Sequence, residues 1–238
     1  MESEQNLKTG SGINYLTPVS IIIAGLLIAG VMYFGDVKKN AEPVVPEQKV
    51  ASLDQIRPVS TEDHIRGNPN APIVIVEYSD TECPFCSRYH TTMKQIMDEY
   101  GKDGKVAWVY RHSPLDQLHA KSRNEAVALE CANELGGNDK FWEYTDRIYG
   151  ITPANDGLDP AELPKIAAYV GLDVAKFNTC MVSGKYDSKI ESDLQNAQAT
   201  GGQGTPWSVI ITKNGEKSAL NGAYPYANIK QIIDTLLK

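Results

Sequence analysis

The sequence has no run of lysine and arginine residues, and its 30 Asp and Glu outnumber its 23 Lys and Arg. A nucleic-acid-binding surface needs clustered basic side chains to neutralise phosphates. The formal net charge of -7 therefore argues against a nucleic-acid partner. The chain also lacks internal repeats and low-complexity tracts, and 238 residues suit one folded domain with additional segments.

Cysteine is scarce, with four residues in the chain. Cys83 and Cys86 form a Cys-x-x-Cys motif, whereas Cys131 and Cys180 lie far apart in the sequence. The distant pair could form a structural disulfide or remain as two buried thiols. The redox state of the compartment decides between these two possibilities.

One segment near the N-terminus has no charged residue. Within it, residues 16–35 are mostly apolar and match the roughly 20 residues that cross a bilayer as a helix. A cleaved signal peptide is the alternative, but the run is longer than the usual signal-peptide core and no A-x-A-like site follows it. We therefore expect a tail over 1–15, a transmembrane signal anchor in contact with lipid over 16–35, and a proline-rich linker over 36–57.

The orientation of this anchor does not follow from charge, because Lys8 precedes it and Lys38 and Lys39 follow it. The chemistry expected of the Cys-x-x-Cys motif needs an oxidising compartment. We therefore expect a single-pass protein of the cytoplasmic membrane whose folded domain, residues 58–238, faces the periplasm or the cell exterior.

The folded domain opens with strand and helix patterns in alternation. A β-branched run at 72–78 predicts a buried strand, and apolar residues at helical spacing from Pro84 predict a helix that Gly101 ends. A second strand at 106–110 completes a βαβ unit.

Helical periodicity then fills residues 119–200. Its segments are 120–135, 140–149, 160–170 and 174–183. Two strands, 207–212 and 217–221, are joined by an Asn-Gly turn and followed by a helix at 226–237. This order predicts an α/β protein with a thioredoxin fold and a helical subdomain inserted at about 119–200.

The stretch Cys83-Pro84-Phe85-Cys86 lies where the first helix begins. Unpaired backbone N–H groups and the positive end of the helix dipole stabilise a thiolate there, and proline suits the first helical position. Because the thiolate is the form that attacks disulfides, Cys83 is the candidate nucleophile, and Cys86, one turn later, the candidate resolving thiol. This chemistry needs no cofactor.

Two other interpretations of the motif are weaker. Cys83 and Cys86 with His90 could bind a metal, but a closed zinc site needs four ligands and no second pair lies near in sequence. A structural disulfide within the motif is disfavoured because its small ring is strained and a helix start makes it reducible. We therefore expect a redox site without a metal.

Residues outside the motif complete the candidate site. Glu77, in the apolar strand, can accept a proton if it faces the space beneath Cys86, and the alternative is a solvent-facing carboxylate. Glu82 should oppose thiolate formation slightly, and Phe85 offers the thiolate no hydrogen bond. Pro206 follows a glycine-rich turn and is compatible with a cis bond, which would free the backbone of Thr205 to bind a substrate peptide.

The soluble part resembles the DsbA-like branch of the thioredoxin superfamily, which includes membrane-tethered bacterial thiol oxidases. The resemblance extends from about residue 58 to the C-terminus. It rests on Asp63 with Gly67 to Pro72, Glu77 to Cys86, Arg111 with Pro114, Leu115 and His119, Cys131-Ala132, Phe141-Trp142, and Gly204 to Pro206.

The resemblance implies that Cys83 is the nucleophile, Cys86 the resolving cysteine, Glu77 the buried acid and Pro206 a cis proline. It implies exported proteins, reduced or misoxidised, as substrates, and reoxidation by a quinone-linked membrane partner if the protein is an oxidase. A disulfide reductase or isomerase, served by a membrane reductant, is the alternative, because Thr205 resembles that branch.

Some relatives carry a second, non-catalytic disulfide in the helical subdomain, and the resemblance puts Cys131 and Cys180 in position for it. His112 and His119 are expected to be structural, since the exchange needs no further base. A last hypothesis keeps the fold but not the catalysis: a membrane-tethered module that binds a metal or a protein partner.

Overall fold

The computed structural model describes residues 51–238. The predicted tail, anchor and most of the predicted linker lie outside the described residues. Within 51–238, no helix is both long enough and apolar enough to cross a membrane.

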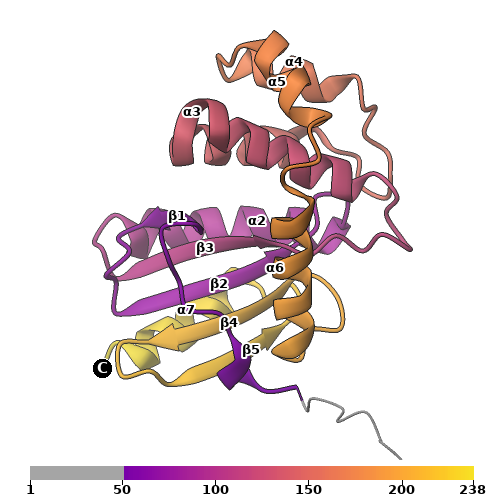
Figure 1. The fold of residues 1–238 in the computed structure, drawn as a ribbon. Helices are drawn as coiled ribbons and strands as arrows, with labels where there is room; N and C mark the ends of the chain where they lie inside the picture. The colour runs from indigo at the N-terminus through magenta and orange to yellow at the C-terminus, as the bar shows by residue number, and fades with distance from the viewer. Residues whose placement is uncertain (1–50) are drawn as a thin grey trace, which may run out of the picture. The chain divides into compact units, whose positions relative to one another are not determined.

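A five-stranded mixed sheet forms the centre of the domain, with strand order β1-β3-β2-β4-β5 (Figure 1). β2 (Ile73–Ser79) pairs in parallel with β3 (Val106–His112) and antiparallel with β4 (Trp207–Thr212). β1 (His64–Gly67) and β5 (Lys217–Asn221) form the two antiparallel edges. The strands predicted from β-branched runs are thus confirmed, whereas β1 has no such pattern and was not predicted.

Helices cover both faces of this sheet. α2 (Pro84–Ile96) and α7 (Tyr226–Leu236) pack against each other beside one face, and α6 (Asp187–Ala199) packs on β2 and β3 from the other, together with the short 3-10 helix η1 (Leu53–Gln55). A π-helical turn, η2 (Met97–Gly101), continues α2 up to the glycine predicted to end it.

The remaining helices form the layer above the sheet in Figure 1. They are α3 (Ser122–Ile151), α4 (Glu162–Tyr169) and α5 (Val174–Met181). α3 joins the two helices predicted at 120–135 and 140–149, and Gly137 marks the break between them with a non-helical φ of 73° and ψ of -172°. The helical insertion is therefore confirmed, but α6 belongs to the covering of the sheet.

The side-chain alternation of β2 decides which residues reach the redox site. Val76 and Tyr78 point into the smaller core under α6, whereas Ile73 and Ile75 point into the core that contains α2. Since side chains two apart share a face of a strand, Glu77 and Ser79 also lie on the α2 side.

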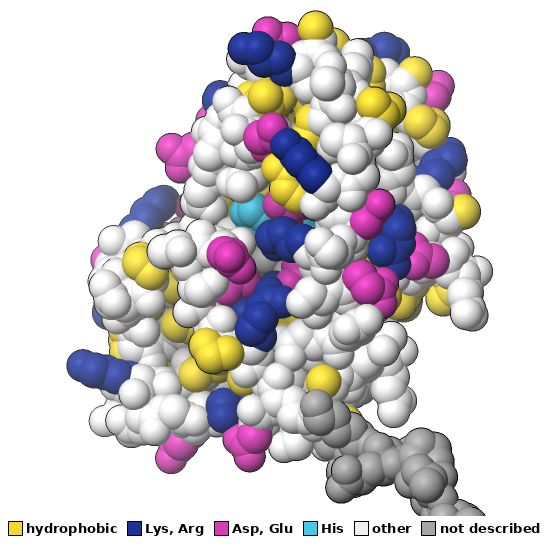
Figure 2. Space-filling view, in the orientation of Figure 1, with side chains coloured by type: hydrophobic (Ala, Val, Ile, Leu, Met, Phe, Trp, Pro, Cys, Tyr) yellow, Lys and Arg dark blue, Asp and Glu magenta, His cyan; other side chains and the backbone are white. Residues whose placement is uncertain are grey.

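Charged side chains of both signs lie close together on the face shown in Figure 2. Ion pairs also link α6 to other segments, because Asp193 pairs with Arg57 and Glu191 pairs with Arg123. No large region of this face carries a single sign of charge.

Candidate active site

The two free cysteines occupy the start of α2, directly after the turn that leaves β2. Cys83 is the N-cap residue with extended backbone angles, φ -79° and ψ 121°, and Pro84 takes the first helical position. The Cys83 N–H donates to the carbonyl of Asp80 over 3.1 Å, which holds the turn. Cys86 lies one turn into α2 on its buried face, with no exposed surface, whereas Cys83 is 4% exposed.

This position stabilises a thiolate on Cys83. The hydrogen bond from the Cys86 thiol contributes most and lowers the pKa of Cys83 from 9.0 to about 6, although burial acts in the opposite direction. Thr205 and the backbone N–H groups of Phe85 and Cys86 add smaller favourable contributions. Burial, followed by the hydrogen bond to Cys83 and then the charge of Cys83, raises the pKa of Cys86 well above its ordinary value. The two thiols therefore differ in the way that nucleophile and resolving thiol require.

The loop before β4 lies against the nucleophile. The Thr205–Pro206 peptide bond is cis. The Cys83 sulfur lies 3.5 Å from the carbonyl oxygen of Thr205. The sequence is compatible with a cis bond at this position, and the structure contains it and brings Thr205 against Cys83.

Glu77 lies in the buried space beneath Cys86, on the predicted face of β2. Burial raises the pKa of Glu77 from 4.5 to about 7, against hydrogen bonds from Ser79 and Trp108 that lower it. The Trp108 indole N–H donates to its carboxylate over 2.8 Å. The negative charge of Glu77 in turn contributes to the raised pKa of Cys86. A carboxyl group with this pKa can exchange a proton with Cys86 near neutral pH.

Ser79 is a further residue of this buried space that sequence analysis did not single out. Its hydroxyl lowers the pKa of both Glu77 and Cys86, and it lies 2.9 Å from the Tyr149 hydroxyl. The signal for its position was available, because it follows Glu77 by two residues in the same strand. Nothing in the local sequence indicated Tyr149, which comes from α3.

Buried acids surround the turn that precedes Cys83. The Glu82 carboxylate accepts hydrogen bonds from the backbone N–H groups of Gly157, at 3.2 Å, and Leu158, at 3.4 Å. Burial, and then the neighbouring Glu82 carboxyl, raise the pKa of Glu125 to about 9. Glu125 is therefore protonated at neutral pH. The sequence marked Glu82 but gave no signal for Glu125.

The alternative metal site at the motif is not formed. His90 turns away from the cysteines and bonds Asp146 through Nε2 at 2.7 Å. Within residues 51–238, one group has metal-ligand spacing, and it consists of His64, His112 and Glu130. Both imidazoles already bond the same carboxylate oxygen at 2.8 Å, and the Lys189 ammonium lies 3.1 Å from it.

Its neighbours stabilise the ionised Glu130 carboxylate. Burial alone would raise the pKa of Glu130, but the hydrogen bonds from His112 and His64 hold it far below its ordinary value. His112 is therefore part of a buried hydrogen-bond network, in line with a structural role.

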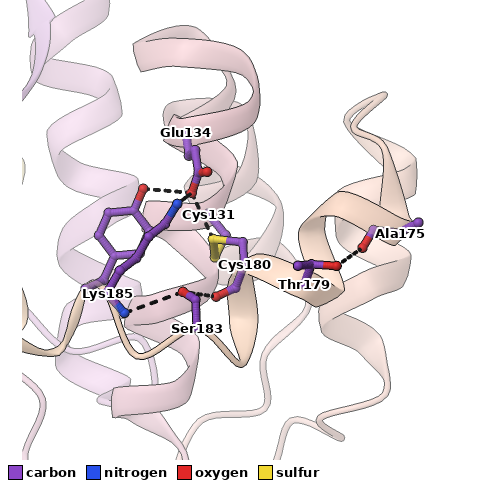
Figure 3. The surroundings of a disulfide bond; sticks show 8 residues. Cys131, Glu134, Ala175, Thr179, Cys180, Ser183 and Lys185 are labelled. Carbon is purple, nitrogen blue, oxygen red and sulfur yellow. Dashed lines mark hydrogen bonds and ion pairs between the residues drawn. A yellow bond between two sulfur atoms is a disulfide. The ribbon is translucent and has the colours of Figure 1, made fainter.

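Cys131 and Cys180 form a disulfide between α3 and α5, with their Cα atoms 5.8 Å apart (Figure 3). Glu134, on the same helix as Cys131, pairs with Lys185 and accepts a hydrogen bond from Tyr186 beside the disulfide. The bond therefore crosslinks the helical subdomain, away from the motif at the start of α2.

Comparisons with known proteins agree with this geometry. The thioredoxin family model matches residues 59–235. The crystal structure of Pseudomonas aeruginosa DsbA2 is 31% identical, has a TM-score of 0.63, and is matched over 76% of this chain and 96% of its own. Wolbachia pipientis alpha-DsbA1, at 24% identity and a TM-score of 0.67, shares the fold and covers 78% of this chain and 96% of its own.

The chain therefore belongs to the thioredoxin family. Within that family it is a DsbA-like thiol–disulfide oxidoreductase.

One similar protein carries a different name. It is the Na(+)/H(+) antiporter NhaA 1 of Mycobacterium sp. (strain KMS), 33% identical over 188 residues. The match covers 76% of this chain but only 29% of the length of that protein. The antiporter name describes that whole protein.

Proposed function

We propose that this oxidoreductase is an extracytoplasmic oxidase that transfers the Cys83–Cys86 disulfide to reduced exported proteins. The observation that carries the proposal is the difference between the two thiols. A Cys83 thiol with a pKa of about 6 is mostly thiolate at pH 7. This stabilises the reduced form and favours donation of the disulfide.

The proposed transfer has two steps. A substrate thiolate attacks the sulfur of Cys83, the more exposed of the pair, and the S–S bond breaks so that Cys86 leaves with the electron pair. Glu77 gives the Cys86 thiolate a proton. A second substrate thiolate then attacks the substrate sulfur of the mixed disulfide, and Cys83 leaves as its stabilised thiolate.

We also propose that residues 16–35 anchor the protein in the cytoplasmic membrane, with the domain in the periplasm or outside the cell. The Cys131–Cys180 disulfide supports an oxidising compartment, because disulfides are rare in the reducing cytosol. A quinone-linked membrane protein would reoxidise the Cys83–Cys86 pair. If the protein acts instead as a reductase or isomerase, which Thr205 before the cis proline favours, a membrane reductant would keep the pair reduced.

The test is exchange activity together with the reduction potential. Cys83→Ser should abolish both insulin reduction and oxidation of a dithiol peptide, and Cys86→Ala should accumulate a mixed disulfide through Cys83. The double variant Cys131→Ala/Cys180→Ala is the matched control and should retain both activities. Activity in Cys83→Ser would reject the nucleophile, and a strongly reducing potential would favour the reductase over the oxidase.

A further inference from the structure

We propose that His119 is a positioning residue for the redox centre, whose imidazolium is held by Asp80 beside Cys83 and stabilises the Cys83 thiolate. The inference rests on the proposed function, in which Cys83 is the nucleophile. It revises the expectation from sequence that His119 has only a structural role. The Cys-Pro-Phe-Cys motif has no basic residue between its cysteines, so any positive side chain near Cys83 comes from another part of the fold.

The contacts of Asp80 bring His119 to the motif. One oxygen of its carboxylate lies 2.9 Å from Nδ1 of His119 and accepts the backbone N–H of Leu115 over 2.8 Å. The other oxygen accepts the N–H of Glu82 over 2.8 Å, and its backbone carbonyl accepts the N–H of Cys83 over 3.1 Å. A single residue therefore joins the His119 loop to the turn that carries the nucleophile.

The surroundings of His119 favour its charged form. Its side chain is only 8% exposed, and burial acts to lower its pKa. The hydrogen bond and charge of Asp80, then the charges of Cys83 and Asp156, overcome burial and raise the pKa above its ordinary value. These three groups come from the turn after β2, the start of α2 and the loop before α4, and all three are acidic. Because electrostatic attraction is mutual, an imidazolium that the Cys83 thiolate stabilises must also stabilise that thiolate.

Two substitutions separate charge from hydrogen bonding. Asparagine in His119→Asn can keep a donor near the position of Nδ1 but carries no charge, whereas His119→Arg keeps a positive charge. We expect His119→Asn to raise the pKa of Cys83 by roughly one, measured from thiolate absorbance at 240 nm in the reduced protein. We expect His119→Arg to restore most of the difference.

The same variants should shift the equilibrium with glutathione. At pH 7 a rise of the Cys83 pKa from about 6 to about 7 lowers the thiolate fraction from about nine-tenths to about one half. This makes His119→Asn a weaker oxidant by about fivefold in the exchange constant, or about 20 mV. The matched control is His90→Gln, which replaces another buried histidine paired with an aspartate; burial lowers the pKa of His90, and glutamine can keep a donor near Nε2. It should leave the pKa of Cys83 unchanged.

A measurement on the unmodified protein tests the interaction between His119 and the Cys83 thiolate even if these variants fail to fold. NMR titration of the His119 ring should give a lower pKa in the oxidised protein than in the reduced protein, because the disulfide removes the thiolate. Equal ring pKa values in the two states, or equal Cys83 pKa values in the natural protein and His119→Asn, would overturn the inference. If Cys83 of the natural protein exchanges with no disulfide, the proposed function itself is wrong.

Discussion

Cys86→Ala removes the hydrogen bond that contributes most to the lowered pKa of Cys83, while the helix start and the Thr205 loop stay in place. A hydrogen bond to a charged group contributes about 1.5–3 kcal/mol, and one pKa unit corresponds to 1.36 kcal/mol. We therefore expect the pKa of Cys83 to rise from about 6 to between about 7 and 8. Cys86→Ser is the matched control, because a hydroxyl can donate the same hydrogen bond, and its Cys83 should titrate close to the natural value.

The assay is a pH titration of thiolate absorbance at 240 nm, paired with the rate of alkylation by iodoacetamide. The second disulfide simplifies the measurement, since Cys131 and Cys180 are bonded and contribute no thiolate. At pH 7 the natural protein and Cys86→Ser should be about nine-tenths thiolate at Cys83, while Cys86→Ala should be half thiolate or less.

Two results would refute the reasoning. If Cys86→Ala still titrates near 6, the backbone N–H groups and the helix dipole suffice, and the Cys86 thiol is not the main cause. If the pKa of Cys83 rises by the same amount in Cys86→Ser and Cys86→Ala, the rise comes from lost packing around the smaller side chain and not from a lost hydrogen bond.

Three further predictions follow from the buried groups and the disulfide. Glu77 has a folded-state pKa raised from 4.5 to about 7, so the folded protein holds a proton that the unfolded chain releases, and stability falls as pH rises through that window. Glu77→Gln should therefore raise the free energy of unfolding by about 3 kcal/mol at pH 8 and by little at pH 4 in urea titrations; an equal gain at both pH values would contradict the buried carboxylate. The pKa of Glu125 is likewise raised, to about 9, so its contribution to stability also falls as pH rises. Glu125→Gln should therefore raise Tm more at pH 8 than at pH 5. A lower Tm at pH 8 would show that protonation of Glu125 does not limit stability there. Cys131→Ala/Cys180→Ala opens a loop with a sequence separation of 49 and should lower the free energy of unfolding by about 4 kcal/mol, and a loss below 1 kcal/mol would mean that the helical subdomain is held by packing alone.

Local pattern was enough to predict the parts of the fold that bury apolar surface in a regular period. β2, β4 and β5 are strands where β-branched runs or turn signals marked them, and α2 begins at the predicted proline. β1 was missed because a four-residue edge strand with His64 and Arg66 has no apolar alternation to detect. Its place is decided by pairing with β3, a contact that no local window contains.

In the candidate site, too, residues close together in the sequence could be predicted, whereas residues brought together by the fold could not. The cysteine pair and Glu77 could be predicted because they lie within ten residues of one another at the end of one strand. Asp80, Glu125 and His119 act through contacts between segments that are 35 or more residues apart, such as the hydrogen bond from Leu115 to Asp80. A sequence shows that these residues are acidic or basic, but their partners and their burial, which set the protonation state, are properties of the folded chain.

The Cys83 thiolate and the Glu77 carboxyl influence the reduction potential of the Cys83–Cys86 pair in opposite directions. Lowering the pKa of Cys83 from 9.0 to about 6 stabilises the reduced protein at pH 7 by about 1.4 kcal/mol at most, and solvent screening at the mouth of the site reduces this value. That corresponds to up to about 30 mV toward oxidising power. Glu77 acts against it, because the Cys83 thiolate raises the pKa of Glu77 and an ionised Glu77 repels the thiolate. Above pH 7, where Glu77 loses its proton, repulsion from its carboxylate offsets part of the stabilisation that the Cys83 thiolate gives the reduced protein.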